Sequence, residues 1–120
     1  MLPHDQRGAG DAVLLLHAGI ADRTMWSEHL DWLADAGFWA IAVDLPGFGE
    51  ARIEPGPQAP WQDVLSTLKE LEVPTVSLVG NSFGAAVALR AQDDGARGVL
   101  DVQVSFPIPE QSARPACTFC

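Results

Sequence analysis

The chain has 120 residues, 48% hydrophobic and 19% charged, a composition typical of one globular domain and unlike that of a disordered segment. Its formal net charge of −9 argues against binding to nucleic acid or to an anionic membrane, since both need a basic face. The first ten residues are polar and the apolar runs are too short to span a bilayer, so the default expectation is a cytoplasmic protein.

Short apolar runs alternate along the chain with segments of helical periodicity. Each apolar run has the length of a buried strand and is bounded by turn residues. The expected strands are 12–16, 39–43, 75–79 and a weaker fourth at 98–104. The expected helices are 25–36, 60–71 and 85–91. We expect the last of these helices to end at the Asp93-Asp94-Gly95 run.

This alternation predicts an α/β fold with a mainly parallel sheet of about four strands, flanked by helices. Ligands bind such sheets beyond the carboxyl ends of the strands. We expect one domain over residues 1–106 and an irregular tail over 107–120, where the proline and serine content rises. The tail carries Cys117 and Cys120 in C-x-x-C spacing, which could be a redox or metal motif. Without further ligands nearby, an incidental pair in a frayed tail is the preferred interpretation.

The run Gly80-Asn81-Ser82-Phe83-Gly84 fits the pattern G-x-S-x-G. It follows an expected buried strand and opens an Ala-rich helix, which is the context of a nucleophile elbow. Such a sharp turn needs a strained serine and small neighbours, which Gly80 and Gly84 provide. We therefore predict Ser82 as a nucleophile, with the N–H of Phe83 as an oxyanion donor at the positive end of the helix. The alternative is that Ser82 only caps the helix.

A second run, His17-Ala18-Gly19, follows the first expected strand. An oxyanion hole needs a second backbone N–H from the loop after a neighbouring strand, and Gly19 is the candidate, with Ile20 behind it. His17 could itself be the base for Ser82 if it reached the hydroxyl. The preferred interpretation is that His17 braces the loop by bonding to backbone groups.

Three motifs together, LLLHAGI, DLPGFG and LVGNSFGAAVAL, resemble the N-terminal half of the α/β-hydrolase superfamily. The resemblance is to its esterases, lactonases and related small-molecule hydrolases, and it covers residues 8–91 and the strand that follows. It implies an oxyanion motif at His17–Gly19, with Ala18 in place of the usual glycine. It implies the nucleophile at Ser82 and the elbow N–H at Phe83.

The same resemblance implies that Asp44 shapes the loop of residues 44–49 and is not the triad acid, with Glu50 where a small polar residue is common. Family members that open epoxides or displace halide use a carboxylate at the elbow, whereas this chain has Ser82, so acyl transfer is favoured. The implied substrate is a small ester, lactone, thioester or similar carbonyl compound, and perhydrolysis is also allowed. The resemblance implies no metal and no cofactor.

The chain departs from the family after the elbow. In the family, the triad acid and histidine follow the nucleophile in chain order, but here the 38 residues after Ser82 contain no histidine. His4 is expected in a short mobile leader, and His29 on the first helix as a surface or boundary residue. The acids Asp93, Asp94 and Asp101 follow the elbow without convincingly matching the position of the triad acid. We therefore expect a chain truncated relative to the family, without its lid and without the catalytic base and acid.

Three functional hypotheses stay open at this point. The first is a serine hydrolase present as a fragment. The second is a non-catalytic binding or interaction domain, or a gene remnant, that keeps the fold without the chemistry. The third is a partner chain that completes the sheet and supplies the missing groups. In this chain alone both sheet edges would be bare where neighbouring strands are missing, so we expect marginal stability or self-association.

Overall fold

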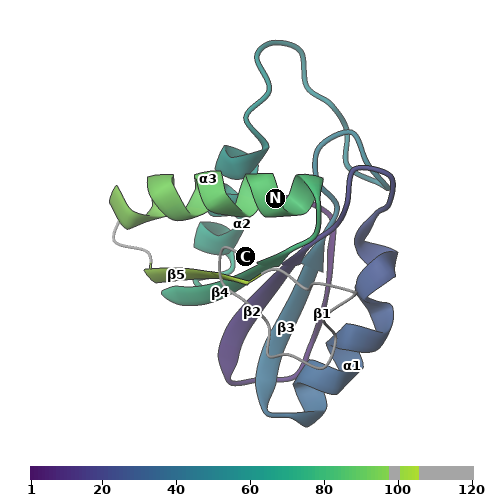
Figure 1. Cartoon of the computed structure of the whole chain (residues 1–120), viewed down its shortest axis with the longest axis vertical. Coiled ribbons are helices and arrows are strands. Elements are labelled where there is room, and N and C mark those ends of the chain that lie inside the picture. The colour runs from purple at the N-terminus through teal and green to yellow at the C-terminus, as the bar shows by residue number, and fades with distance from the viewer. Residues whose placement is uncertain (98–100, 106–120) are drawn as a thin grey trace.

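In the part of the chain that the structure describes, a five-stranded mixed sheet forms the centre (Figure 1). The computed structural model describes residues 1–97 and 101–105. In chain order the strands are β1 (His4–Arg7), β2 (Asp11–Leu16), β3 (Phe38–Val43), β4 (Thr75–Gly80) and β5 (Asp101–Ser105). Their order in the sheet is β1-β3-β2-β4-β5, and β1 alone pairs antiparallel to its neighbour, while the other pairings are parallel.

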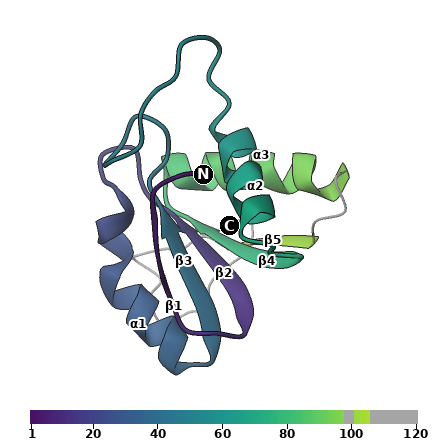
Figure 2. The same cartoon turned by 180° about the vertical axis from the view of Figure 1, so that it is seen from behind.

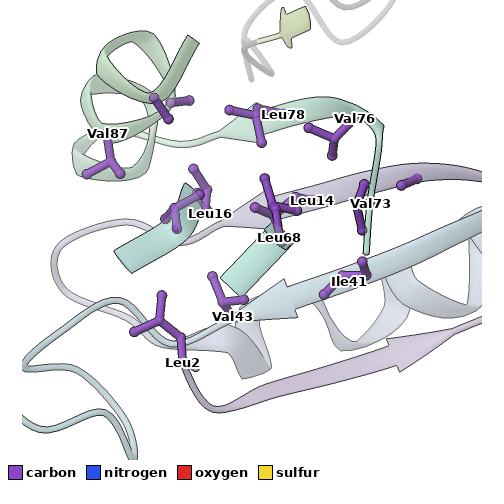
Figure 3. Close-up of a cluster of buried hydrophobic side chains, with 14 of the residues drawn as sticks. Leu2, Leu14, Leu16, Ile41, Val43, Leu68, Val73, Val76, Leu78 and Val87 are labelled. Atoms are coloured by element: carbon purple, nitrogen blue, oxygen red, sulfur yellow. The ribbon is translucent and has the colours of Figure 1, made fainter. Parts of the chain in front are cut away.

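Helices cover both faces of this sheet, as Figure 2 shows from behind. They are a short 3-10 helix η1 (Arg23–Trp26), α1 (Ser27–Asp35), α2 (Pro60–Glu70) and α3 (Phe83–Arg97). Alternate side chains of β2 point to opposite faces, so Leu14 and Leu16 pack with α2 and α3, whereas Val13 and Leu15 pack with α1. The larger buried cluster lies on the α2 and α3 face (Figure 3). Among the described residues no helix has the length and apolar character needed to cross a bilayer.

The expectation of a mainly parallel α/β sheet is confirmed, and the four strands expected from apolar runs are present. The expected mobile leader is wrong, because residues 4–7 form β1 against β3. Backbone pairing holds this polar segment: Pro3 accepts a hydrogen bond from the N–H of Asp44 at 2.9 Å, and the buried Leu2 donates its N–H to Thr67 Oγ1 at 3.0 Å. An edge strand with charged side chains has no apolar pattern for a sequence reading to detect.

The expected end of the third helix is also wrong. Helix α3 continues through Asp93, Asp94 and Gly95 to Arg97. It packs along both β4 and β5, so the crossover between these parallel strands must run back over their length. The expected tail 107–120 and both cysteines lie outside the described residues. Self-association through the sheet edges stays a prediction.

The carboxyl ends of three parallel strands meet at one edge of the sheet. Leu16, the last residue of β2, pairs with Val43 of β3 on one side and with Gly80 of β4 on the other. The residues that follow these strand ends are His17, Asp44 and Asn81, and they begin the three loops singled out from the sequence. The topology therefore places all three loops at the edge where parallel sheets bind ligands.

Candidate active site

Ser82 stands on a sharp turn between β4 and α3. Its φ is 55°, in the left-handed region that side chains other than glycine rarely adopt. Among the described residues Glu72 is the other such case, with φ 58°, but it follows the end of α2, where left-handed residues are common. Ser82 instead lies between a strand and a helix, and its side chain is exposed to solvent. The backbone strain of this turn is therefore located at Ser82, the residue whose side chain the turn exposes.

The two glycines of the G-x-S-x-G run are required by close backbone approach. A Cβ on Gly84 would lie 2.2 Å from the carbonyl oxygen of Leu16, at the end of β2. A Cβ on Gly80 would lie 2.6 Å from the backbone of Ala85 in α3. Both distances are far shorter than a real Cβ contact, so any side chain at these positions would push the turn away from the sheet.

Helix α3 begins at Phe83, directly after the serine. The carbonyl of Ser82 accepts hydrogen bonds from the N–H groups of Ala85 and Ala86, at 3.0 and 3.2 Å, and Asn81 accepts from Gly84 at 3.0 Å. The first N–H groups of a helix point outward from its positive end. The N–H of Phe83 therefore lies at a helix N-terminus beside the serine, as an oxyanion donor would.

The loop after β2 lies against the start of α3. A Cβ on Gly19 would be 3.2 Å from the Cβ of Phe83, so the two sequence-predicted donor residues are neighbours in space. A hydrogen bond from the N–H of Asn81 to the carbonyl of Leu16, at 3.2 Å, joins the two strand ends beneath them. Ile20 is fully exposed. The structure thus brings Gly19, Phe83 and Ser82 to one place.

His17 is fully buried, and both of its ring nitrogens bond to backbone groups. Nε2 accepts the N–H of Leu45 at 2.9 Å, which requires an unprotonated Nε2. Nδ1 lies 2.7 Å from the carbonyl oxygen of Ala18 and so carries the proton that it donates. This arrangement supports the brace interpretation of His17, because neither nitrogen is left to take a proton from Ser82.

Asp44 is buried to 1% exposure and is surrounded by donors. Its carboxylate accepts the backbone N–H of Arg23 at 2.8 Å and that of Glu50 at 2.9 Å, and it pairs with the Arg23 guanidinium. Arg23 also pairs with Glu50 at 2.5 Å and with Asp5 of β1 at 3.1 Å. Hydrogen bonds to Glu50, and then to Asp5 and Asp44, raise the pKa of Arg23. Asp44 therefore holds its own loop at Glu50, as the resemblance implies, and also holds the neighbouring loop at Arg23. Both oxygens of its carboxylate accept hydrogen bonds.

Sequence reasoning missed two contributors to this edge. One is Arg23, one of seven basic residues in an acidic chain and part of none of the motifs singled out from the sequence. The other is Phe48, which lies within the DLPGFG motif. Its ring packs edge-on against His17, with centroids 5.2 Å apart, and against Phe83 at 5.8 Å. Phe48 thus connects the loop after β2 with the start of α3.

A groove of about 480 Å³ lies beside the elbow. Its lining comes from the first turns of α2 and from one side of α3, and is mainly apolar. The residues are Pro60, Trp61, Phe83, Ala86, Val87, Leu89, Arg90 and Asp93. The guanidinium of Arg90 lies 4.5 Å above the Trp61 ring. The groove could accept an apolar group next to a carbonyl held at the elbow.

The two other histidines lie in β1 and α1. His4 Nδ1 is 3.0 Å from the carbonyl of Leu2. His29 packs between Trp26 and Trp32, with ring centroids 5.0 and 4.9 Å away. Within residues 1–97 and 101–105, no group of three histidine, cysteine or acidic side chains is arranged to hold a metal ion.

Comparisons with known proteins agree with this geometry. A family profile described as "Alpha/beta hydrolase family" matches residues 13–118. "Epoxide hydrolase 2" from Siraitia grosvenorii is 36% identical over 107 residues, which is 82% of this chain and 34% of that protein. "2-hydroxy-6-oxo-6-phenylhexa-2,4-dienoate hydrolase" from Comamonas testosteroni is 30% identical over 96 residues, or 74% of this chain and 34% of that protein. The chain spans about a third of the length of these curated relatives.

The solved structures that are similar to this chain include both esterases and epoxide hydrolases. A thermophilic esterase from Thermogutta terrifontis superposes with a TM-score of 0.75 at 32% identity, over 86% of this chain and 39% of that one. An epoxide hydrolase from Vigna radiata superposes with a TM-score of 0.74 at 23% identity, over 84% of this chain and 34% of that one. At 23% identity, the similarity to the Vigna radiata enzyme shows only that the two chains share a fold.

Proposed function

Because the chain belongs to the alpha/beta hydrolase family, we propose that Ser82 is its nucleophile and that its chemistry is acyl transfer from a small ester, lactone or similar carbonyl substrate. The observation that carries this proposal is the left-handed backbone of Ser82, at φ 55°, between β4 and α3. Strain at a functional residue persists only where the surroundings enforce it. Here Gly80 and Gly84 permit the turn, and the hydroxyl faces solvent.

In the proposed reaction the Ser82 oxygen attacks the substrate carbonyl carbon while its hydroxyl proton passes to a general base. The negative charge that develops on the carbonyl oxygen is stabilised by the N–H groups of Phe83 and Gly19. The intermediate then expels the alcohol, which takes up a proton, and leaves an acyl-serine that water hydrolyses. A serine hydroxyl needs a base to react at a useful rate, and His17 is committed to the backbone. We propose that the base and its acid come from outside these 120 residues.

Several relatives carry the name epoxide hydrolase. The choice between opening an epoxide and transferring an acyl group rests on the residue at the elbow. The resemblance described above assigns a carboxylate nucleophile to epoxide-opening members. A neutral hydroxyl suits attack on a carbonyl, whereas a carboxylate suits displacement at a saturated carbon. Ser82 therefore favours the ester or lactone substrate.

A second candidate is a binding domain without catalysis. The commitment of both His17 nitrogens to backbone groups favours it, because His17 then cannot serve as the base for Ser82. Such a domain would keep the elbow and the groove beside α3 and would hold a carbonyl ligand without cleaving it.

The test is fluorophosphonate labelling of the purified chain with imidazole added as an external base. The proposal expects slow labelling that imidazole accelerates and that peptide mapping assigns to Ser82. Ser82→Ala should abolish the accelerated phase, whereas Ser66→Ala, at an exposed serine of α2, should leave it unchanged. Labelling spread over surface serines, or an equal rate in Ser82→Ala, would contradict the nucleophile. A folded chain that binds an ester but never labels would favour the binding domain.

A further inference from the structure

The loops after β2 and β3 hold each other through a reciprocal pair of hydrogen bonds. His17, at the end of β2, accepts the backbone N–H of Leu45 in the other loop at 2.9 Å. Asp44, at the end of β3, accepts the backbone N–H of Arg23 in the first loop at 2.8 Å. Each strand-end side chain thus fixes the backbone of the opposite loop. Both side chains are buried, so water does not compete for these bonds.

This reciprocal pair encloses one proposed oxyanion donor. Gly19 lies in the chain between the two tethered points, His17 and Arg23, in a loop with small side chains at Ala18 and Ala21. His17 also reaches the second donor through Phe48, whose ring contacts both His17 and Phe83. The position of Gly19 relative to Phe83 therefore depends on the hydrogen bonds of His17 and Asp44 as well as on the direct contact between the two donor residues.

We propose that His17 and Asp44 are positioning residues for the oxyanion donors, with Phe48 linking His17 to Phe83. This inference rests on the proposed nucleophilic role of Ser82. Donor N–H groups act on a developing oxyanion only when they lie about 2.7–3.1 Å from it, so a small displacement of the Gly19 loop removes the stabilisation. Positioning of this kind needs an outer layer of locked side chains, which the reciprocal pair provides.

The experiment uses phenylboronic acid, which needs no base in the protein. Its trigonal boron forms a bond to the Ser82 oxygen, the serine proton passes to buffer, and the tetrahedral boronate places a charged oxygen at the donors. Affinity is measured by boron NMR on folded protein. We expect His17→Leu, which removes the acceptor for Leu45, to weaken binding about tenfold or more, since loss of one oxyanion donor costs at least that much in rate. His17→Gln keeps an acceptor and should restore affinity to within about threefold of the wild type.

A matched core variant separates positioning from stability. Leu68→Ala, at a buried site on α2, should destabilise the fold but leave the boronate affinity of the folded fraction unchanged. Phe48→Leu, at a half-buried loop site, gives a second variant should His17→Leu fail to fold, and it should weaken binding several-fold. Wild-type affinity in both His17→Leu and Phe48→Leu, or in Phe48→Leu alone if His17→Leu does not fold, would overturn the positioning role.

The Ser82→Ala variant distinguishes the two proposals. If the wild type binds the boronate and Ser82→Ala does not, the nucleophile stands, and the His17 and Phe48 variants decide the positioning role by themselves. If Ser82→Ala binds as well as the wild type, the proposed function is wrong, and the positioning inference falls with it.

Discussion

The two sides of the candidate site are built in different ways. The elbow, residues 80–86, is held by short-range backbone bonds and by close approach of Gly80 and Gly84 to neighbouring backbone. The facing loops, residues 17–26 and 44–50, are held by bonds from His17 and Asp44 to backbone groups 28 and 21 residues away in sequence. One side is thus fixed by backbone shape and the other by buried polar side chains.

This difference predicts how each side responds to substitution. A backbone turn should fail when a side chain is added, because the added atoms meet main-chain atoms that cannot move aside. A polar network should fail when a side chain is removed, because its partners remain buried without hydrogen bonds. Three substitutions test this contrast, in order of decreasing effect on the free energy of unfolding.

The largest effect is expected for Asp44→Ala in the facing loops. Removal of the carboxylate leaves the Arg23 guanidinium, whose side chain is 16% exposed, without its most buried partner. Breaking a buried pair from one side costs about 3–5 kcal/mol, which urea unfolding would measure. The control is Asp31→Ala, which breaks an exposed pair with Arg7 and should cost less than about 1 kcal/mol. Equal losses in the two variants would show that Asp44 is not structurally special.

An intermediate effect is expected for Gly84→Ala in the elbow. The new Cβ would lie 2.2 Å from the Leu16 carbonyl oxygen, so α3 or β2 must shift. We expect a loss of about 2–3 kcal/mol, the usual cost of overpacking at a rigid site. Gly19→Ala serves as the control, because its Cβ would meet a Phe83 side-chain carbon at 3.2 Å and should cost less than about 1 kcal/mol. A tolerated Gly84→Ala would mean that the turn is softer than its geometry indicates.

The smallest effect is expected from relieving strain at Ser82. Glycine adopts a left-handed backbone without a Cβ penalty, so Ser82→Gly should unfold with a free energy about 1 kcal/mol higher than that of Ser82→Ala. The same pair at Ser66, inside α2, should show the opposite sign, since alanine is favoured over glycine in a helix by about 1 kcal/mol. If Ser82 and Ser66 responded alike, the left-handed turn would not be a source of strain in solution.

Much of the fold could be predicted because its signals are local. The apolar runs that became β2 and β3 are continuous because these strands are buried on both faces. In β4 the run is interrupted by Ser77, and buried residues alternate with partly buried ones. The polar strand β1 could not be predicted, since it is held to β3 by backbone pairing that leaves no mark on its side chains. The same holds for the far end of α3, where a run of two acids and a glycine continues a helix that packs on β4 and β5.

The sequence by itself determined the elbow, because a strained serine flanked by glycines can be specified within five residues. It also indicated Gly19 and Phe83 as donors, through their place after two neighbouring strands. Only the tertiary structure decided what holds them. The partners of His17, Asp44 and Phe48 lie on other loops, and a hydrogen bond across 28 residues exists only after the sheet has brought the strand ends together. The backbone turn is specified by residues that are adjacent in sequence, whereas the polar network that faces it forms only once the sheet has folded.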